Sequence, residues 1–423
     1  MNLLLRNSNF LKLFIGRIVT NIGDSIYYIA SMWLVYELGG NAFYTGLAGF
    51  LILLPKALQF LTGPFIDRCS IKKILVTTQI LQCILVLFIP IAYLYDFLSI
   101  QLILIVMPLI AFIEEFAYPA QTKALPLILE KDDLINGNSL FAFAYQGVDI
   151  VFNAIAGILV AMFGVMVLYI ADSITFAVAT LCFGLLKVTQ SPDSNQIKPP
   201  QKSIIGFVKI YLMEIKEGFK VVFGSLLWAI LIGTLIANFS IGVAMAVLPS
   251  FADQIGGVKM YGIFLAALSI GSLIGALTGP LIGKFRLGYA TIIAFTLGGI
   301  CWTLSGITSI PLLSAILFGL AWIPIGSINV LFAGVAQAVI PNYLLGRVSS
   351  VISSVSVGVM PIGSLVGGYL AVSLGSKTIF SFTGIGMLCI TIIWIIHPVL
   401  RRLPVINSIN VETLKIKINE DNR

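Results

Sequence analysis

The composition of this chain of 423 residues excludes an ordinary soluble domain: 59% of the residues are apolar and 10% are charged, whereas soluble domains carry about 25% charged residues. Since a bilayer span needs about 20 apolar residues, the apolar content suffices for about a dozen spans. The net charge of +7 is spread over short loops and not gathered in one dense patch with aromatic residues, so we expect no nucleic-acid partner.

Twelve long apolar segments, separated by charged residues, Gly or Pro, are predicted to form membrane-spanning helices. No cleavable signal peptide is recognised before the first segment, which is therefore expected to remain in the mature protein. In chain order the predicted spans cover residues 10–36, 43–66, 73–95, 100–124, 138–162, 165–187, 225–249, 260–283, 288–308, 311–338, 347–372 and 376–397.

The basic residues predict how these spans are oriented. If the N-terminus is cytoplasmic, only Lys259 and Lys377 among the 25 Lys and Arg residues fall in external loops. The positive-inside rule therefore places both ends of the chain in the cytoplasm.

An internal repeat divides the chain into two halves. The sequence LTGPFI at residues 61–66 recurs as LTGPLI at 277–282, an offset of 216 residues that also pairs Gln121 with Gln337. Matches at one register across half a chain indicate duplicated units, and parallel six-helix repeats are an established transporter architecture.

The predicted fold is an all-α membrane protein with twelve transmembrane helices in two pseudo-symmetric six-helix bundles. Residues 1–190 form the first bundle. Residues 191–224 form a cytoplasmic linker that contains either an amphipathic helix or an extension of span seven. Residues 225–423 form the second bundle and a short cytoplasmic tail.

Polar residues form a stripe along predicted span one. Asn21, Asp24 and Tyr28 recur at helical spacing and share one face, and a charge inside a span is costly enough to indicate a function. Asp24 could bind a proton or a cation, or it could pair with Lys56 at a similar depth in span two. Of these two interpretations, we favour the pair with Lys56.

Two adjacent acids, Glu114 and Glu115, lie about half-way along predicted span four. Successive helical residues point about 100° apart, so the two cannot both face one cavity squarely. Burial favours the uncharged form of a carboxyl group, which is the property that a proton-coupling residue needs. The alternative is an ion pair with Lys56 or hydrogen bonding to neighbouring helices, and the sequence does not decide which Glu faces the cavity.

Predicted span five carries a second polar stripe, formed by Gln146, Asp149 and Asn153. This stripe is either a cavity wall opposite span four or a hydrogen-bonded packing seam. The second half has almost no charge within its spans, and its polar cavity candidates are Asn238 and Asn329. Acids on one wall and aromatic residues on the other would suit a bulky amphiphilic or cationic ligand.

The loop after span two resembles the signature loop of the major facilitator superfamily. It contains a Gly, an Asp-Arg pair and a basic cluster: Gly63, Asp67, Arg68, Lys72 and Lys73. Gly63 permits close helix approach, and Asp67 can accept charged hydrogen bonds. In that family the cluster latches the two halves on the cytoplasmic side, so the resemblance implies a cytoplasmic gating motif here.

Three further stretches resemble the macrolide-efflux and enterobactin-exporter branch of the same superfamily. They are NIGD at 21–24, YPA at 118–120 with NGNSL at 136–140, and RV at 347–348 with PIG at 361–363. The resemblance implies export driven by proton antiport in a bacterial cytoplasmic membrane. The exported molecule would then be a macrolide-like drug or, as an alternative, a siderophore.

We therefore expect a monomeric secondary active transporter that exports a bulky amphiphilic small molecule by proton-coupled alternating access. A lysophospholipid transporter or flippase is an alternative with the same fold, and a non-transporting membrane sensor is an alternative of another class. No phosphate loop, nucleophile elbow or metal-ligand spacing is recognised, so we expect no enzyme activity, no metal and no cofactor besides the proton motive force. The expected partners are the small molecule and the lipid bilayer.

Overall fold

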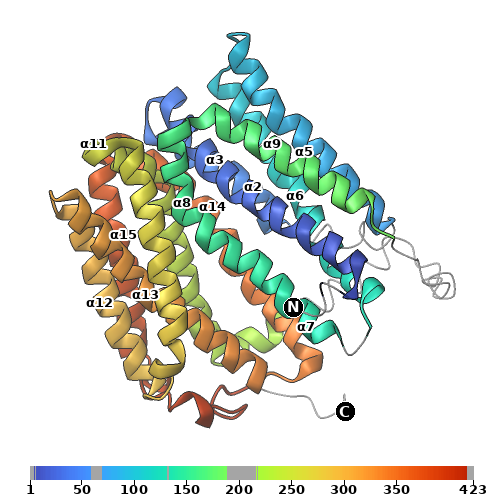
Figure 1. The fold of residues 1–423 in the computed structure, drawn as a ribbon. Coiled ribbons are helices and arrows are strands. Elements are labelled where there is room, and N and C mark those ends of the chain that lie inside the picture. The colour runs from blue at the N-terminus through green and yellow to red at the C-terminus, as the bar shows by residue number, and fades with distance from the viewer. Residues whose placement is uncertain are drawn as a thin grey trace. The chain divides into compact units, whose positions relative to one another are not determined.

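The computed structural model describes residues 4, 6–58, 69–130, 133–187, 216 and 218–416, and helices dominate this part of the chain (Figure 1). Before the predicted linker the helices are α2 (Ser8–Gly39), α3 (Ala42–Ala57), α5 (Ile71–Leu94), α6 (Ile100–Ile128), α7 (Leu134–Ala142), the π-helical turn η3 (Phe143–Gly147), α8 (Val148–Phe163) and α9 (Val165–Gly184). After it they are α11 (Leu227–Ile282), α12 (Leu287–Ile307), α13 (Pro311–Val339), α14 (Asn342–Leu374), α15 (Ser376–Ile396), α16 (Pro398–Arg401) and the 3-10 turn η5 (Ile406–Ser408).

Eight of the described helices are long and apolar enough to cross a membrane. One of them, α11, has 56 residues and leaves the helical conformation at Gly256 and Gly257, so it contains the predicted spans seven and eight. Gly257 has a φ of 71°, a left-handed value that Gly adopts without steric cost. Helix α2 is not among the eight, and it carries Arg17 and Asp24 within its apolar sequence. The total of twelve spans and the cytoplasmic position of both ends stay predictions.

The chain forms two compact units. The first comprises Met1–Lys198 and Ala252–Ala266, and the second comprises Pro199–Phe251 and Ala267–Arg423. The short insertion in the first unit differs from the predicted division at the linker. It is held there by a hydrogen bond of 2.9 Å from the hydroxyl of Tyr36 to Asp253, and by the ring of Tyr261, which stacks on Trp33 with centroids 5.6 Å apart.

Corresponding helices of the two units pack in the same way. Helix α5 begins at Ile71 and α12 begins at Leu287, which is the same offset of 216 residues as in the sequence repeat. Within the first unit α5 lies against α6 and α9, and within the second α12 lies against α13 and α15. The repeat read from the sequence therefore corresponds to a repeated helix packing.

The apolar core of the first unit lies near the start of α2. It joins Phe10 of α2, Leu75 of α5, Leu125 of α6 and Phe183 of α9, none of them more than 2% exposed. Close van der Waals packing of such side chains is what holds helices together within a membrane. The core thereby holds α2 next to α6 and α9, on the N-terminal side of Arg17.

Within the second unit, two glycines allow α11 and α14 to approach closely. A Cβ atom added to Gly363 would overlap the carbonyl oxygen of Phe239, and one added to Gly242 would overlap that of Met360. Small residues at a crossing let helix backbones come together in a membrane, where van der Waals packing drives association. The crossing therefore depends on the absence of a side chain at both positions.

We expect Gly363→Ala to lower the thermal unfolding temperature of the purified protein, because the added methyl group forces the two backbones apart at a cost of about 1–3 kcal/mol. Gly358 of the same helix is the matched control, since a Cβ atom there meets nothing within 4 Å. Gly358→Ala should be neutral or stabilising, because Ala favours a helix by about 0.5–1 kcal/mol over Gly. Equal unfolding temperatures of the two variants would contradict the close crossing.

Candidate functional site

A buried arginine is the centre of the polar residues in the first unit. Arg17 of α2 is 3% exposed, and its guanidinium carbon lies 4.7 Å from the ring centroids of both Tyr118 of α6 and Tyr145 of η3. Its Nη1 donates a hydrogen bond of 3.0 Å to the Gln121 side chain. The two rings, with centroids 5.2 Å apart, lie on one side of the guanidinium, and together with the amide oxygen they stabilise a desolvated cation.

The π-helical turn brings Tyr145 to this position. Residues 143–147 form a π-turn between α7 and α8, and such turns inside helices occur often at functional sites. The wider turn interrupts the regular backbone hydrogen bonding of an α-helix. Within the turn, the carbonyl oxygen of Ala144 accepts a hydrogen bond of 2.8 Å from the side-chain amide of Asn21. The predicted stripe on span one therefore contacts the segment that orients Tyr145.

Carboxyl groups from three helices lie around Arg17. Asp149 of α8 accepts a hydrogen bond of 2.8 Å from the hydroxyl of Ser25, which fixes α8 against α2. Asp24, about two turns beyond Arg17, is partly buried. Asp24 and Glu114 are both near enough for their charges to act on Arg17. The structure thus brings three of the predicted acids to one basic residue.

The two adjacent acids of α6 have different surroundings. Glu114 is exposed, whereas Glu115 is 8% exposed. The exposed apolar residues Ile105 and Phe112 mark the side of α6 that suits lipid, and Glu114 lies roughly opposite to them at about 100° per residue. Tyr118, one turn on from Glu114, shares its side and contacts Arg17. Glu114 therefore lies on the side of α6 whose Tyr118 contacts Arg17, while Glu115 is buried on another side.

Lys56 does not form the ion pair that the sequence favoured. Lys56 and Asp24, both in the described part of the chain, make no salt bridge with each other; the charged residues that act on Lys56 through space are Glu114, Glu115 and Asp149. The reason is that α3 packs more extensively on α6 than on α2. Lys56 therefore belongs with the acids of α6 and α8.

Arg17 is absent from the residues that sequence reasoning selected for the site. Its position in the sequence could have identified it. Arg17, Asn21, Asp24 and Tyr28 follow one another at intervals of four, three and four residues and so share one helix face. A single Arg near the end of a span also satisfies the positive-inside rule. Arg17 was therefore interpreted only as a signal of orientation and not as a residue of the site.

Several predicted residues lie outside the described part of the chain or have undescribed side chains. Gly63, Asp67 and Arg68 of the gating motif and most of the linker, residues 191–215 and 217, lie outside it. Lys72 and Lys73 lie in the first turn of α5. Gln146 and Asn153 lie in η3 and α8, but their side chains are not described. The gating motif stays a prediction.

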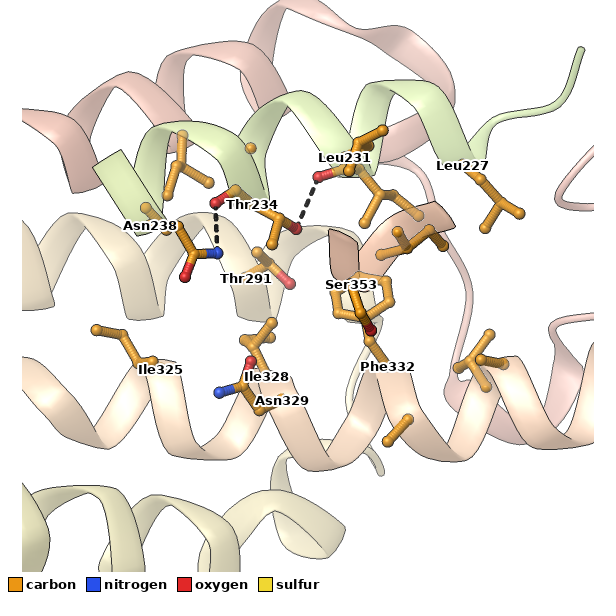
Figure 2. A pocket seen from close by; sticks show the side chains of 18 of the residues that line it. Leu227, Leu231, Thr234, Asn238, Thr291, Ile325, Ile328, Asn329, Phe332 and Ser353 are labelled. Carbon is orange, nitrogen blue, oxygen red and sulfur yellow. Dashed lines mark hydrogen bonds between the residues drawn. The ribbon is translucent and has the colours of Figure 1, made fainter. Parts of the chain in front are cut away.

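The second unit contains a cavity of about 460 Å³ between α11, α12, α13, α14 and α15. Asn238 of α11 and Asn329 of α13 extend into it from facing sides, and Asn238 donates a hydrogen bond of 3.0 Å to the carbonyl oxygen of Thr234 (Figure 2). The lining residues of the described chain carry no charge and include the aromatic residues Phe295, Phe332 and Trp394. The cavity thus offers apolar surface with a few neutral polar groups.

The two units differ in chemistry despite their common packing. The first gathers Arg17, Lys56 and four carboxyl groups, while the cavity of the second is neutral. Such a division can separate proton binding, which requires ionisable groups, from the binding of an apolar molecule, which requires desolvated surface.

Known proteins that resemble this chain are membrane transporters and efflux proteins. The family model described as transmembrane secretion effector matches residues 4–421. The staphyloferrin A transporter of Staphylococcus aureus (strain NCTC 8325 / PS 47) is 25% identical, over 92% of this chain and 94% of the relative. Macrolide efflux protein A of Streptococcus pyogenes is 25% identical over 96% and 98%. The multidrug efflux pump Tap of Mycolicibacterium fortuitum is 24% identical over 93% and 96%.

Solved structures share the fold at low sequence identity. A bacterial homologue of the iron transporter ferroportin in an inward-facing state matches with a TM-score of 0.66 and 14% identity, over 92% of this chain and 98% of that one. The nucleoside transporter NupG matches with a TM-score of 0.67 and 11% identity, over 92% and 98%.

Proposed function

Because the chain belongs to the transmembrane secretion effector family of the major facilitator superfamily, we propose that it exports a bulky, largely apolar small molecule and that proton entry drives the export. The chain is a multi-pass transporter of the bacterial cytoplasmic membrane, and efflux proteins are among its relatives. The observation that carries the proposal is the cluster of carboxyl groups around Arg17 and Lys56.

Charge balance connects this cluster to protons. Asp24, Glu114, Glu115 and Asp149 are carboxyl groups, and Arg17 and Lys56 are the basic groups on which they act. Where acids outnumber bases away from bulk water, the cluster becomes neutral by taking up protons. Proton uptake then weakens the attraction between α2, α6 and α8, and proton release restores it. This gives two arrangements of the helices that a proton gradient can bias.

The cavity of the second unit supports an apolar substrate. Its volume of about 460 Å³ lies within the range of small-molecule sites, about 300–1,000 Å³. The amides of Asn238 and Asn329 can orient polar groups of a ligand, while Phe332 and Trp394 contribute aromatic surface. A neutral cavity gives no ionic preference, which agrees with relatives that are described as multidrug and macrolide efflux proteins.

A siderophore exporter is the second candidate. It is favoured by the relative described as a staphyloferrin A transporter, which matches over nearly the whole chain. The neutral lining of the cavity favours the largely apolar substrate instead, because a ligand with several charges would lose more hydration there, without counter-charges, than a mainly apolar molecule with one.

Export from a pump-depleted bacterial host tests the proposal. We expect cells that express the chain to accumulate less erythromycin and ethidium than cells with an empty vector, and a protonophore should remove this difference. The same cells are assayed for siderophore secretion. Export that continues at the original rate after collapse of the proton gradient would overturn proton coupling, and siderophore secretion without drug export would favour the second candidate.

A further inference from the structure

The segment that follows the last long helix folds back onto the second unit. After α16, residues 403–416 continue through η5 and a turn at 411–415. Four of their apolar side chains are buried: Leu403 at 1%, Ile409 at 8%, Leu414 at 1% and Ile416 at 6% exposure. The predicted short cytoplasmic tail is therefore a packed part of this unit in the described region.

Backbone hydrogen bonds fix the tail at the beginnings of two helices. The amides of Leu287 and Gly288 donate to the carbonyl oxygens of Pro404 and Leu403 at 3.1 and 3.3 Å. The amide of Leu226 donates to the carbonyl oxygen of Leu414 at 2.8 Å. The first amides of a helix have no partner within it, and neither α11 nor α12 has a capping hydrogen bond from its N-cap side chain. Carbonyl groups of the tail supply such partners.

Two glycines make room for this contact. A Cβ atom on Gly288 would overlap the carbonyl oxygen of Arg401, and one on Gly283 would lie 3.4 Å from the side chain of Ile406. Both belong to the 279–288 stretch, which corresponds through the 216-residue offset to the predicted gating motif of the first half. In the second half Gly283-Lys284 stands in place of Asp67-Arg68, and the tail packs on this loop.

The tail also reaches the neutral cavity. Leu414 is one of its lining residues, together with Leu227 at the first turn of α11 (Figure 2 labels Leu227). Ile416, two residues further and equally aliphatic, is buried but does not line the cavity. One residue of the tail, Leu414, thus borders the space between the helices, with 1% of its surface exposed.

We propose that residues 403–416 form one wall of the substrate cavity and that Leu414 is a specificity-determining residue, which limits the size of the apolar group that the cavity accepts. This inference rests on the proposed function, because it assigns the cavity to the substrate. A leucine at the wall gives contact to a compact apolar group and excludes a larger one. Undocking of the tail opens the cavity at the beginning of α11.

Substrate preference tests the role of Leu414. We expect Leu414→Ala to raise the export of erythromycin relative to the smaller ethidium by about tenfold, since a few methyl groups in an apolar pocket discriminate by this order. Leu414→Trp should shift the ratio the opposite way. Ile416→Ala removes a comparable buried side chain and should leave the ratio unchanged. Equal ratios in all three variants, or the same shift in Ile416→Ala, would overturn the assignment.

Thiol labelling tests the docked tail without transport. The five native cysteines are replaced, and Thr291→Cys places a thiol at a lining residue of α12 that is 1% exposed. We expect N-ethylmaleimide to label this thiol slowly, and Leu414→Ala to accelerate labelling at least about tenfold by opening the wall beside it. Ile416→Ala, at a residue that does not line the cavity, should leave the labelling rate unchanged. An unchanged rate in Leu414→Ala would overturn the wall. If the parent exports neither probe, the proposed function fails, and the labelling result alone decides whether the tail closes the cavity.

Discussion

Arg17→Ala is expected to abolish export and to lower the free energy of unfolding by about 3–5 kcal/mol, the usual consequence of removing one partner from a buried charge cluster. The substitution leaves Asp24 and Glu114 without the basic group that acts on both. It also leaves the buried side chain of Gln121 without the hydrogen bond that it accepts, and removes the cation that contacts the rings of Tyr118 and Tyr145. Thermal unfolding and drug export measure the two effects.

Arg286 provides the matched control, because its guanidinium carbon also lies over a tyrosine, 5.8 Å from the ring centroid of Tyr289, but at an exposed position. Exposed cation–π contacts contribute about 0.5–1 kcal/mol, so Arg286→Ala should unfold and export almost as the parent does. Arg17→Lys keeps the charge without the planar group that two rings and Gln121 contact, and should recover stability only in part. Arg17→Ala protein with parental stability and export would contradict the central role of this residue.

Glu114→Gln should remove the ability of a pH gradient to drive export. In proteoliposomes, one proton moving down a gradient of one pH unit releases about 1.4 kcal/mol, enough to maintain about a tenfold ratio of substrate across the membrane. Glutamine keeps the shape of the side chain but cannot take up and release this proton. The ratio supported by the gradient should therefore fall to about one, while exchange of labelled for unlabelled substrate without a gradient continues.

Glu115→Gln is the control that distinguishes loss of proton coupling at Glu114 from a general disturbance of helix α6. Glu115 follows Glu114 directly but is 8% exposed, on a different side of the helix. We expect the variant to retain gradient-driven export, with any change appearing in thermal stability. If Glu114→Gln keeps the full substrate ratio, or if both variants lose it equally, Glu114 is not the coupling residue.

Helical periodicity predicted which polar residues share a face but not which helices meet there. Asn21 and Asp24 lie on one stripe as expected, and Asn21 contacts the π-turn. The expected pair of Asp24 with Lys56 was wrong. It was inferred from their similar depth in the membrane, but α3 packs mainly on α6, and Lys56 therefore lies near Glu114, Glu115 and Asp149 instead. Similar depth is a weak predictor of contact, since a helix has neighbours on several sides.

The tail and the π-turn show a second limit. The tail shows no helical periodicity, yet Leu403, Ile409, Leu414 and Ile416 are buried, because burial of an irregular segment depends on the groove that receives it. The π-turn at 143–147 likewise has no local signature, although it decides the direction of Tyr145. Both features arise from contacts between segments that are distant in the chain.

The sequence by itself determined that this chain is a membrane protein of the major facilitator superfamily with a repeat of 216 residues, because apolar length, charge distribution and internal similarity are properties of the chain. Only the tertiary structure decided that Arg17 lies near Asp24 and Glu114, that Glu114 is exposed while Glu115 is buried, and that Leu414 borders the neutral cavity. The physical reason is that a charge or an apolar side chain acts on the groups that surround it in space, and those groups come from several helices.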